Sequence, residues 1–425
     1  MRIGIDYTSA ARQRAGIGRY TRELVRALLS LDGAHGYTIF AATGRLPEEE
    51  WSDEIHHLRS TCDRQPAIRS VPVTDDWLAR LWHRLHLPIP VELVTGCLDV
   101  FYSPDFTLPP TLPGTRTLLT IHDLSFVRHP DTFVSSLRRY LERVVPRSID
   151  RADVVLADSA HTSSDLAAVF GISSEKVEVI TPGVDARFRP DPALSSATAG
   201  EGQRPEAERL RERYDIGDEP YILSLGTVQP RKNYVRLIQA FAKTRANQRG
   251  DGPTQSSESR QPPRSTQLPG STQLPGSTQL PRQLLIAGGY GWLYEDVVAE
   301  ADKHDDVRLL GFVEDEDLPA LYRGASLFAF PSLYEGFGLP VLEAMACGVP
   351  VVCSNTSSLP EVAGNAALLV DPLDVDGLSA ALHRALEDAE LRRTMIDRGL
   401  AQAARFTWEQ SARQLRDVIT SWEER

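Results

Sequence analysis

The most constraining feature of this 425-residue sequence is an alternation of short apolar runs with helix-like segments, and the alternation occurs twice. The first series opens with RIGID at residues 2–6 and closes with VEVITPGVD at 177–185. The second opens with YILSLG at 221–226 and continues to VPVVCS at 349–354. Alternation of this kind is typical of parallel strands joined by crossover helices. The sequence therefore predicts an α/β protein with two doubly wound, mostly parallel sheets.

The length and the spacing of the two series suggest the domain boundaries. A chain of 425 residues exceeds one ordinary hydrophobic core. We place an N-terminal domain at residues 1–183 and a C-terminal domain at residues 184–405. Residues 406–425 have apolar side chains at helical spacing and predict an amphipathic helix that packs back toward the N-terminal domain.

A low-complexity segment interrupts the second series at residues 249–282. The hexapeptide STQLPG at 265–270 recurs at 271–276, and STQLP follows at 277–281. The segment contains few large apolar residues, so it cannot bury enough surface to order itself. It predicts a disordered surface loop between a helix and the strand QLLIAGG, away from the functional motifs described below.

Charge and cysteine content exclude several function classes. The chain has 46 basic and 58 acidic residues, a net charge of −12, which disfavours a nucleic-acid partner. Its four cysteines form no CxxC pair, so neither a disulfide framework nor a zinc cluster is indicated. The charged N-terminus does not resemble a secretory signal, and no window approaches about 20 apolar residues. These features predict a cytoplasmic protein.

Residues 77–93, WLARLWHRLHLPIPVEL, permit two interpretations. They mix large apolar side chains with Arg80, Arg84 and two histidines. The favoured interpretation is an ordinary helix that covers the N-terminal sheet. The alternative is peripheral contact with the inner face of a membrane, where an anionic surface would attract the arginines.

A cationic pair stands where a strand gives way to a helix in GTVQPRKNY, residues 226–234. Arg231 and Lys232 are adjacent, and Asn233 can cap the helix that follows. A helix N-terminus carries free N–H groups and partial positive charge, and Arg with Lys is a usual pair for gripping a diphosphate. A solvated surface pair is the alternative.

Two carboxylates lie eight residues apart in EGFGLPVLE, residues 335–343. Glu335 follows a strand and precedes two glycines, so a ligand can approach the backbone there. Pro340 suits the first turn of a helix, and we expect Glu343 within that turn. Both carboxylates are suited to accept hydrogen bonds from sugar hydroxyls. Glu343 has a simpler alternative role, because an acid near a helix N-terminus complements the helix dipole.

These motifs resemble those of the retaining GT-B glycosyltransferases, and of family 4 in particular. The resemblance rests on EGFGLPVLE with PRKN upstream, on GVPVVCS, and on TIHDLSFVRHP and AGIGRYTREL in the N-terminal half. It covers nearly the whole chain outside 249–282, and the similar members are mannosyl- or related hexosyltransferases. The N-terminal element reads as a strand, a glycine-bearing polar loop and a helix. Many relatives have two glycines where this chain has Ala15 and Gly16.

The resemblance implies two Rossmann-like domains that face each other across a cleft. The nucleotide-sugar would bind mostly to the C-terminal domain and the acceptor mostly to the N-terminal domain. Arg231 and Lys232 would hold the diphosphate. Glu343 would accept from the ribose hydroxyls, and Glu335 would contact the transferred sugar. The backbone lining that sugar pocket would be Gly336, Phe337, Gly338 and Leu339.

Further positions follow from the same resemblance. The base would lie beside a strand end, and the diphosphate would also meet the loop after the first strand. His122 would lie by the donor sugar near the reacting carbon. The residues implied at the base are Gly311, Phe312 and Val313, and those implied at the diphosphate are Gly16 and Gly18.

We expect metal-independent chemistry, because the cationic pair can neutralise the diphosphate. In addition, no metal-binding DxD motif stands in a suitable loop. The resemblance implies retention of anomeric configuration. No evident carboxylate can serve as the nucleophile that retaining hydrolases use. The resemblance implies a front-face substitution in which the departing phosphate helps to deprotonate the acceptor.

The predicted function is transfer of a hexose from a nucleotide-diphosphate sugar to a glycan or lipid-linked saccharide. GDP-mannose is the first candidate for the donor. A UDP-glucose or other UDP-sugar enzyme of the same fold is the main alternative. An NAD-dependent oxidoreductase is a poorer one, because AGIGRY lacks the third glycine of GxGxxG. An inactive GT-B adaptor is also possible, although the intact cationic pair and both carboxylates argue against it.

Overall fold

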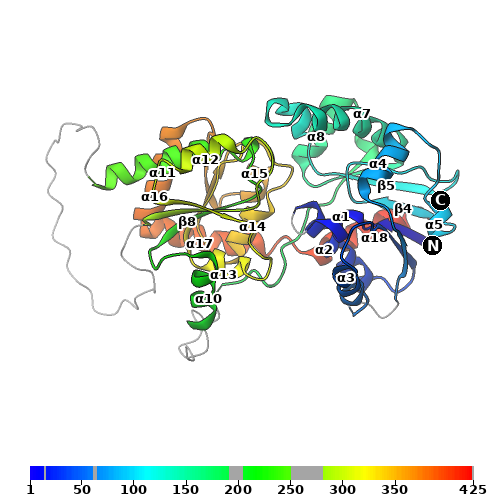
Figure 1. Ribbon diagram of the computed structural model, residues 1–425, viewed down its shortest axis with the longest axis horizontal. Helices are drawn as coiled ribbons and strands as arrows, with labels where there is room; N and C mark the ends of the chain where they lie inside the picture. Colours follow the sequence, from blue (N-terminus) through cyan, green and yellow to red (C-terminus); the bar gives the residue numbers. More distant parts are fainter. Residues whose placement is uncertain (14–15, 61–64, 191–203, 250–280, 424–425) are drawn as a thin grey trace.

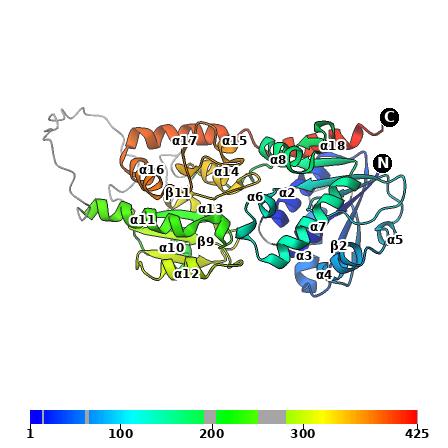
Figure 2. The same ribbon diagram turned by 90° about the horizontal axis from the view of Figure 1, so that it is seen from above.

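The computed structural model describes residues 1–13, 16–60, 65–190, 204–249 and 281–423. It consists of two α/β domains side by side, each a parallel sheet with helices against it (Figure 1, Figure 2). The prediction of two doubly wound parallel sheets is confirmed. The STQLPG repeats fall outside the described residues, so the prediction about that segment stays open.

The N-terminal sheet has seven parallel strands in the order β3-β2-β1-β4-β5-β6-β7. The strands are β1 (Arg2–Asp6), β2 (Gly36–Ala42), β3 (Ala67–Val71), β4 (Val100–Ser103), β5 (Arg116–Ile121), β6 (Val154–Ala157) and β7 (Val177–Val179). The helices are α1 (Thr8–Arg12), α2 (Ile17–Leu31), α3 (Glu48–Ser60), α4 (Asp75–Ala79), the π-helix η1 (Arg80–Arg84), α5 (Glu92–Thr95), α6 (Ser125–Arg128), η2 (Pro130–Thr132), α7 (Ser135–Arg151), α8 (Ala160–Phe170) and η3 (Ser174–Lys176).

The C-terminal sheet has six parallel strands in the order β10-β9-β8-β11-β12-β13. The strands are β8 (Tyr221–Leu225), β9 (Gln283–Ala287), β10 (Val307–Gly311), β11 (Ala325–Phe330), β12 (Val351–Ser354) and β13 (Ala367–Val370). The helices in this half of the chain are α10 (Arg204–Tyr214), the 3-10 turn η4 (Pro230–Lys232), α11 (Tyr234–Arg249), α12 (Glu295–Ala301), α13 (Leu318–Arg323), α14 (Leu339–Ala346), α15 (Leu359–Ala363), α16 (Val375–Glu387) and α17 (Ala389–Ala403), followed by α18 (Trp408–Thr420), which packs on the N-terminal domain.

Central strands read as short apolar runs because helices cover both faces of each sheet. In β4, for example, Val100, Phe101 and Tyr102 are all fully buried although their side chains alternate in direction. Within the described ranges, none of the helices combines the length and the apolar character needed to span a bilayer.

Helix α18 lies on the N-terminal domain although it ends the C-terminal half of the chain (Figure 2). Its buried residues Trp408, Leu415 and Ile419 share one core cluster with Leu24 and Leu28 of α2. The chain therefore passes between the two sheets twice, once before α10 and once before α18. These two segments are hydrogen-bonded to each other, since the Val184 amide donates to the Phe406 carbonyl over 3.0 Å.

The polar loop expected after the first strand is wrong in part, because α1 occupies Thr8–Arg12. The carboxylate of Asp6 accepts a hydrogen bond from the Thr8 amide at 2.9 Å and so satisfies a free donor of that first turn. The sequence has no strong apolar periodicity across five residues, which is why the pattern did not reveal this helix.

Candidate active site

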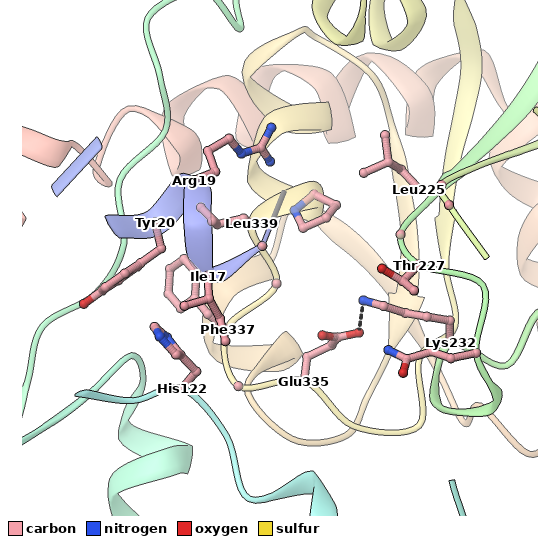
Figure 3. Close-up of a pocket in the computed structure, with 18 of the residues that line it drawn as sticks. Ile17, Arg19, Tyr20, His122, Leu225, Thr227, Lys232, Glu335, Phe337 and Leu339 are labelled. Carbon is pink, nitrogen blue, oxygen red and sulfur yellow. Dashed lines mark hydrogen bonds and ion pairs between the residues drawn. The ribbon is translucent and has the colours of Figure 1, made fainter. Parts of the chain in front are cut away.

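A cavity of about 430 Å³ lies between the two domains, at the carboxyl ends of their strands (Figure 3). Residues that follow β5, β8, β9, β10 and β11 line it, and the start of α2 closes one side. In doubly wound sheets, this edge is where ligands bind, because the loops and helix N-termini converge there. The position agrees with the cleft expected from the sequence.

Arg231, Lys232 and Glu335 form a buried ion triad in this cavity. The Lys232 ammonium donates to Glu335 Oε1 over 2.6 Å, and Arg231 Nη1 lies 2.8 Å from Glu335 Oε2. Lys232 and Glu335 are each only 8% exposed. The turn η4 directly after β8 presents both cations, and the loop after β11 presents the acid.

The electrostatic balance of the triad favours an anionic ligand. Burial by itself raises the pKa of Glu335, but Arg231 and Lys232 outweigh it and bring the pKa to about 2. Burial lowers the pKa of Lys232, and Glu335 opposes that effect. With Arg231 charged and Glu335 ionised, one carboxylate faces two cationic groups. The site can therefore exchange this internal carboxylate for a ligand that carries more negative charge.

Glycines make room for the cationic pair and expose backbone to the cavity. A Cβ on Gly226 would lie 2.9 Å from Lys232 Cε, and one on Gly288 would lie 2.1 Å from the Gly226 carbonyl oxygen. Gly288 and Gly289 follow β9 and line the cavity. Sequence reasoning missed these two glycines. The available indication was the GG pair directly after the apolar run QLLIA, which permits close backbone approach.

The loop of Glu335 and Gly336 also fastens the C-terminal domain to the N-terminal domain. The Gly336 carbonyl accepts from Ser159 Oγ at 2.7 Å and from Thr162 Oγ1 at 3.2 Å. A Cβ on Gly336 would lie 1.8 Å from the His122 carbonyl oxygen. This glycine is therefore required by a contact between domains as well as by the cavity that it lines.

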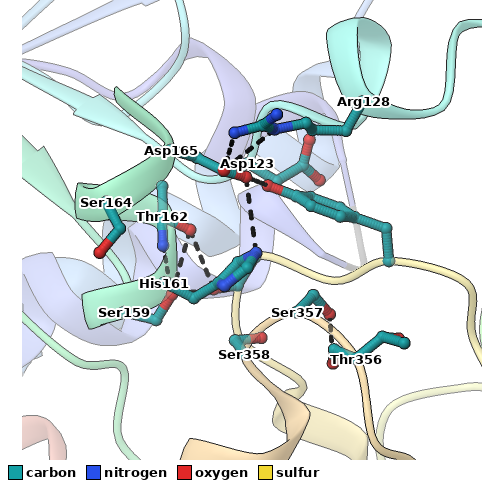
Figure 4. Close-up of polar contacts among 12 residues, drawn as sticks. Asp123, Arg128, Ser159, His161, Thr162, Ser164, Asp165, Thr356, Ser357 and Ser358 are labelled. Carbon is teal, nitrogen blue, oxygen red and sulfur yellow. Dashed lines mark hydrogen bonds and ion pairs between the residues drawn. The ribbon is translucent and has the colours of Figure 1, made fainter. Parts of the chain in front are cut away.

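A neighbouring polar network extends the same contact between domains (Figure 4). The Tyr334 hydroxyl donates to Asp165 Oδ2 over 2.5 Å, and Arg128 binds the other oxygen of that carboxylate. His161 Nε2 lies 3.5 Å from Asp165 Oδ2. Asp165 thus contacts Arg128 and His161 of its own domain and Tyr334 of the other. Because Tyr334 precedes Glu335, these contacts also hold the Glu335 loop in place.

His122 follows β5 and lines the cavity, as its place in TIHDL suggested. Its Nδ1 lies 2.7 Å from Asp158 Oδ2 and its Nε2 lies 3.0 Å from the Pro104 carbonyl oxygen. Burial lowers the pKa of His122, but Asp158 outweighs this effect and the pKa rises to about 9. The Pro104 carbonyl oxygen only accepts, so Nε2 carries a proton, and the raised pKa favours a second proton on Nδ1 beside Asp158.

Glu343 does not line the cavity. It is the fifth residue of α14 and lies in the second helical turn, so its expected place in the first turn is wrong. The helix begins at Leu339, before Pro340, which shifts the register. Glu343 is 2% exposed, ion-paired with Arg19 of α2, and accepts from the Tyr322 hydroxyl at 2.9 Å. Arg19 lines the cavity and was missed, because one arginine in a helix gives no distinct pattern.

The remaining residues of the EGFGLP loop agree with the position expected for them. Phe337, Gly338 and Leu339 line the cavity beside Gly336, and Gly338 precedes α14 with a φ of +114°. Asn233 lies before α11, but its side-chain amide donates to the carbonyls of Pro331 and Pro372. The capping role expected for it is replaced by a tie between loops.

The two glycines before and in α2 have different roles in the structure. Gly16 lines the cavity and has a φ of +60°, a conformation that favours glycine. Gly18 does not line it. A Cβ there would lie 1.9 Å from the Gln13 carbonyl oxygen, so Gly18 permits close packing of α2 on the preceding chain.

The residues expected at the base lie at the end of β10. Phe312 and Val313 line the cavity, and Phe312 is 44% exposed. Gly311 has a φ of +70°, and its carbonyl accepts from the Gly288 amide at 2.7 Å, so it connects the ends of β9 and β10. Among the described residues, no cluster of three or more His, Cys, Asp or Glu side chains has the arrangement of a metal site. Metal independence stays a prediction.

Comparison with known proteins now identifies the family. A family model described as Glycosyltransferase Family 4 matches residues 14–188, and one described as Glycosyl transferases group 1 matches residues 271–402. The chain is 32% identical over 407 residues to the O-antigen chain mannosyltransferase B of Escherichia coli, which covers 93% of each chain. This chain belongs to the family 4 glycosyltransferases. The NAD-dependent oxidoreductase alternative is therefore wrong.

Other relatives of this family 4 glycosyltransferase differ in length. The serotype-specific mannosyltransferase WbdA of Escherichia coli is 31% identical over 433 residues, 97% of this chain but 47% of that protein. The D-inositol 3-phosphate glycosyltransferase of Salinispora tropica is 32% identical over 323 residues, 72% of this chain and 59% of that protein. This chain thus spans about half the length of WbdA.

Solved structures confirm the GT-B fold of the glycosyltransferase. Sucrose-phosphate synthase from Thermosynechococcus elongatus matches with a TM-score of 0.68 at 20% identity and covers 100% of this chain and 99% of its own. WaaG, a glycosyltransferase involved in lipopolysaccharide biosynthesis, matches with a TM-score of 0.64 at 16% identity and covers 99% of this chain and all of its own. At these identities the matches carry the fold only.

Proposed function

We propose that this glycosyltransferase moves a hexose from a nucleotide-diphosphate sugar to the end of a glycan or a lipid-linked saccharide. Mannose is the first candidate for the hexose. The observation that carries the proposal is the triad of Arg231, Lys232 and Glu335 at the cleft between the domains. Two relatives that match 93% and 97% of this chain are mannosyltransferases by name, which supports mannose as the transferred sugar. GDP-mannose is the donor that we expect first.

The triad suggests how leaving-group stabilisation would work. Breaking the bond between sugar and diphosphate places growing negative charge on the phosphate oxygens. Arg231 and Lys232 would bind that charge more strongly in the transition state than in the ground state, which lowers the barrier. Glu335 would give up part of its pairing and accept hydrogen bonds from hydroxyls of the transferred sugar.

His122 is poorly suited to remove a proton from the acceptor. Its two nitrogens already donate to Asp158 and Pro104, and with a pKa of about 9 it carries its proton at neutral pH. We propose instead that its positive charge stabilises the nucleotide-sugar donor bound in the cavity. The departing phosphate would then receive the acceptor proton, in a front-face substitution with retention.

Glu343 requires a rearrangement before it can bind a ribose. In the structure its carboxylate is occupied by Arg19 and Tyr322. Gly18 would serve α2 packing, while Gly16 would approach the diphosphate. Phe312 and Val313 would contact the base, together with the backbone of Gly311.

Donor identity is the part of the proposal with the clearest alternative. HepE of Anabaena has been solved in complex with UDP-glucose and has this fold, with a TM-score of 0.66 at 16% identity. A UDP-sugar donor is therefore the second candidate. An inactive GT-B adaptor is a third, which the intact triad opposes.

A thermal-shift screen against GDP, UDP and ADP sugars tests the donor. A ligand that binds only the folded protein raises the free energy of unfolding, and the increase grows with the ratio of ligand concentration to Kd. We expect Tm to rise with GDP-mannose and to rise less with the other nucleotides. A larger rise with UDP-glucose would favour the alternative, and no rise with any of them would contradict the proposal.

Residues 77–93 combine packing on the sheet with an exposed surface. Leu78, Trp82 and Val91 pack in or against the core of the N-terminal domain, which agrees with the favoured interpretation of a helix that covers the sheet. The stretch forms the short helix α4, the π-helix η1 and an exposed connection, and α4 buries no residue. Leu85 is 64% exposed and Leu93 is 75% exposed. We propose that this surface rests on anionic lipid when the acceptor is lipid-linked. Flotation with anionic vesicles tests this. Loss of binding in Leu85→Ser but not in Leu373→Ser, an exposed leucine of the other domain, would support it.

A further inference from the structure

A second cavity of about 430 Å³ lies in the N-terminal domain alone, at the ends of β1 and β4 and beneath α4, η1 and α7. We propose that this cavity is the acceptor subsite, and that its lining selects an uncharged saccharide end against a phosphorylated one. The inference rests on the proposed function and goes beyond it by assigning residues and a charge class to the acceptor.

The second cavity adjoins the first through a shared wall. Phe106 lines the second cavity, and its ring centroid lies 5.6 Å from that of His122, which lines the first. His122 also contacts the Pro104 carbonyl two residues earlier. A saccharide held beyond Phe106 therefore lies beside the donor cavity.

Two carboxylates at the base of the cavity have hydrogen-bonding capacity to spare. Asp6 Oδ1 accepts from the Thr8 amide at 2.9 Å, and Asp105 Oδ1 accepts from the Phe106 amide at 2.7 Å. Asp105 Oδ2 has no hydrogen-bond donor among the described residues, whereas Asp6 also accepts a hydrogen bond from the Thr8 side chain. A carboxylate oxygen accepts readily from sugar hydroxyls, so the two residues are suited to hold a polyhydroxyl ligand.

His83 provides an independent indication of a ligand. It is 8% exposed, lines the cavity and has no hydrogen-bond partner within the described part of the chain. A buried polar side chain without a partner is unusual and needs an explanation. Burial lowers its pKa to about 4, so the ring is neutral near pH 7 and offers one donor and one acceptor. A hydroxyl matches this pair of groups, whereas a phosphate would need a cation.

The charge of the lining opposes an anionic ligand. Four acids line the cavity, namely Asp6, Asp75, Asp76 and Asp105, against the two arginines Arg12 and Arg84. Arg12 is already paired with Asp75 at 2.9 Å. An added phosphate would meet unpaired carboxylates, and such like-charge contacts discriminate strongly against a wrong ligand.

Aromatic side chains complete the match to a sugar. Trp82 and Tyr140 line the cavity together with Phe106. The Trp82 indole N–H donates to the Ile89 carbonyl over 3.0 Å, which fixes the ring. The aromatic rings together with the polar side chains of the lining offer a saccharide both apolar faces and hydrogen-bond partners.

Saturation-transfer NMR on the full chain, with the nucleoside diphosphate present, tests the inference. The probes are methyl mannoside, methyl glucoside and their 6-phosphates. We expect a neutral glycoside to bind at least tenfold more tightly than its phosphate. Asp105→Asn should weaken binding of the neutral glycoside about tenfold and bring its affinity closer to that of the phosphorylated glycoside. His83→Ala should weaken binding of the neutral glycoside to the same extent.

Asp150→Asn, an exposed aspartate of α7 outside the cavity, is the matched control and should change neither ratio nor affinity. Equal binding of neutral and phosphorylated probes, no binding of any probe, or equal effects of Asp105→Asn and Asp150→Asn would overturn the inference. If Asp105→Asn fails to fold, His83→Ala decides. Sugar binding that follows these expectations without any transfer from a donor would contradict only the proposed function.

Discussion

Arg19 of the N-terminal domain and Glu343 of the C-terminal domain form a buried ion pair across the cleft, and Tyr322 binds the second oxygen of that carboxylate. Arg19 is 7% exposed and Glu343 2%. The second carboxylate of the EGFGLPVLE motif is thus bound to the opposite domain, and the pair joins the two domains beside the first cavity.

Removing one partner of this pair should destabilise the protein strongly. Arg19→Ala leaves Glu343 buried and unpaired, which costs about 3–5 kcal/mol in comparable pairs. We expect a lower unfolding midpoint in urea. The double variant Arg19→Ala with Glu343→Gln should recover part of the loss, because it also removes the unpaired charge. Equal stability of Arg19→Ala and the unaltered protein would contradict the structural role of the pair.

The cationic pair and its carboxylate should matter for turnover beyond any loss of stability from breaking a buried ion pair, which urea unfolding of each variant measures. Lys232→Ala and Glu335→Gln should each lower kcat by about 10²–10³-fold, the scale seen when one transition-state contact is removed. Steady-state kinetics with the donor found by thermal shift is the measurement. Lys243→Ala, an exposed lysine paired with Asp376, serves as the control and should be near normal. Near-normal rates in both triad variants would show that the diphosphate binds elsewhere.

The pH dependence of stability should carry the signature of His122. Its pKa in the folded protein, about 9, lies above the ordinary value of 6.5. A group with a raised folded pKa contributes stability that is complete below its unfolded pKa and is lost as pH rises through the folded pKa. We expect a loss of stability between about pH 6.5 and 9, measured by urea unfolding. The loss should be smaller in His122→Asn, and an unchanged profile in that variant would count against the imidazolium.

Gly336 should tolerate no side chain, because a Cβ there would lie 1.8 Å from the His122 carbonyl oxygen. Gly336→Ala should push the domains apart, increase the radius of gyration in small-angle X-ray scattering and reduce activity. Gly33→Ala is the control, since a Cβ there meets nothing within 4 Å. A compact, active Gly336→Ala protein would mean that the contact between domains is not needed for function.

Much of the fold could be predicted because each strand and helix carries its own local pattern. β1, β5, β8 and β11 appear as apolar runs, and α8 ends at Gly171 with the left-handed conformation that glycine favours. The helix α1 escaped prediction because its five residues have no clear periodicity. Such short elements depend on local hydrogen bonds, as between Asp6 and Thr8.

The sequence by itself determined the two parallel sheets, the family and the strand ends that carry Arg231, Lys232 and Glu335. The periodicity of apolar residues and the spacing of motifs are local properties of the chain, so they can be read without the structure. Only the tertiary structure decided that Glu343 pairs with Arg19, that Gly336 serves a contact between domains, and that His83 faces the acid-lined second cavity without a partner. These relationships join residues from separate elements, some of them hundreds of positions apart. Burial, charge pairing and hydrogen-bond satisfaction there depend on three-dimensional packing, which no local pattern encodes.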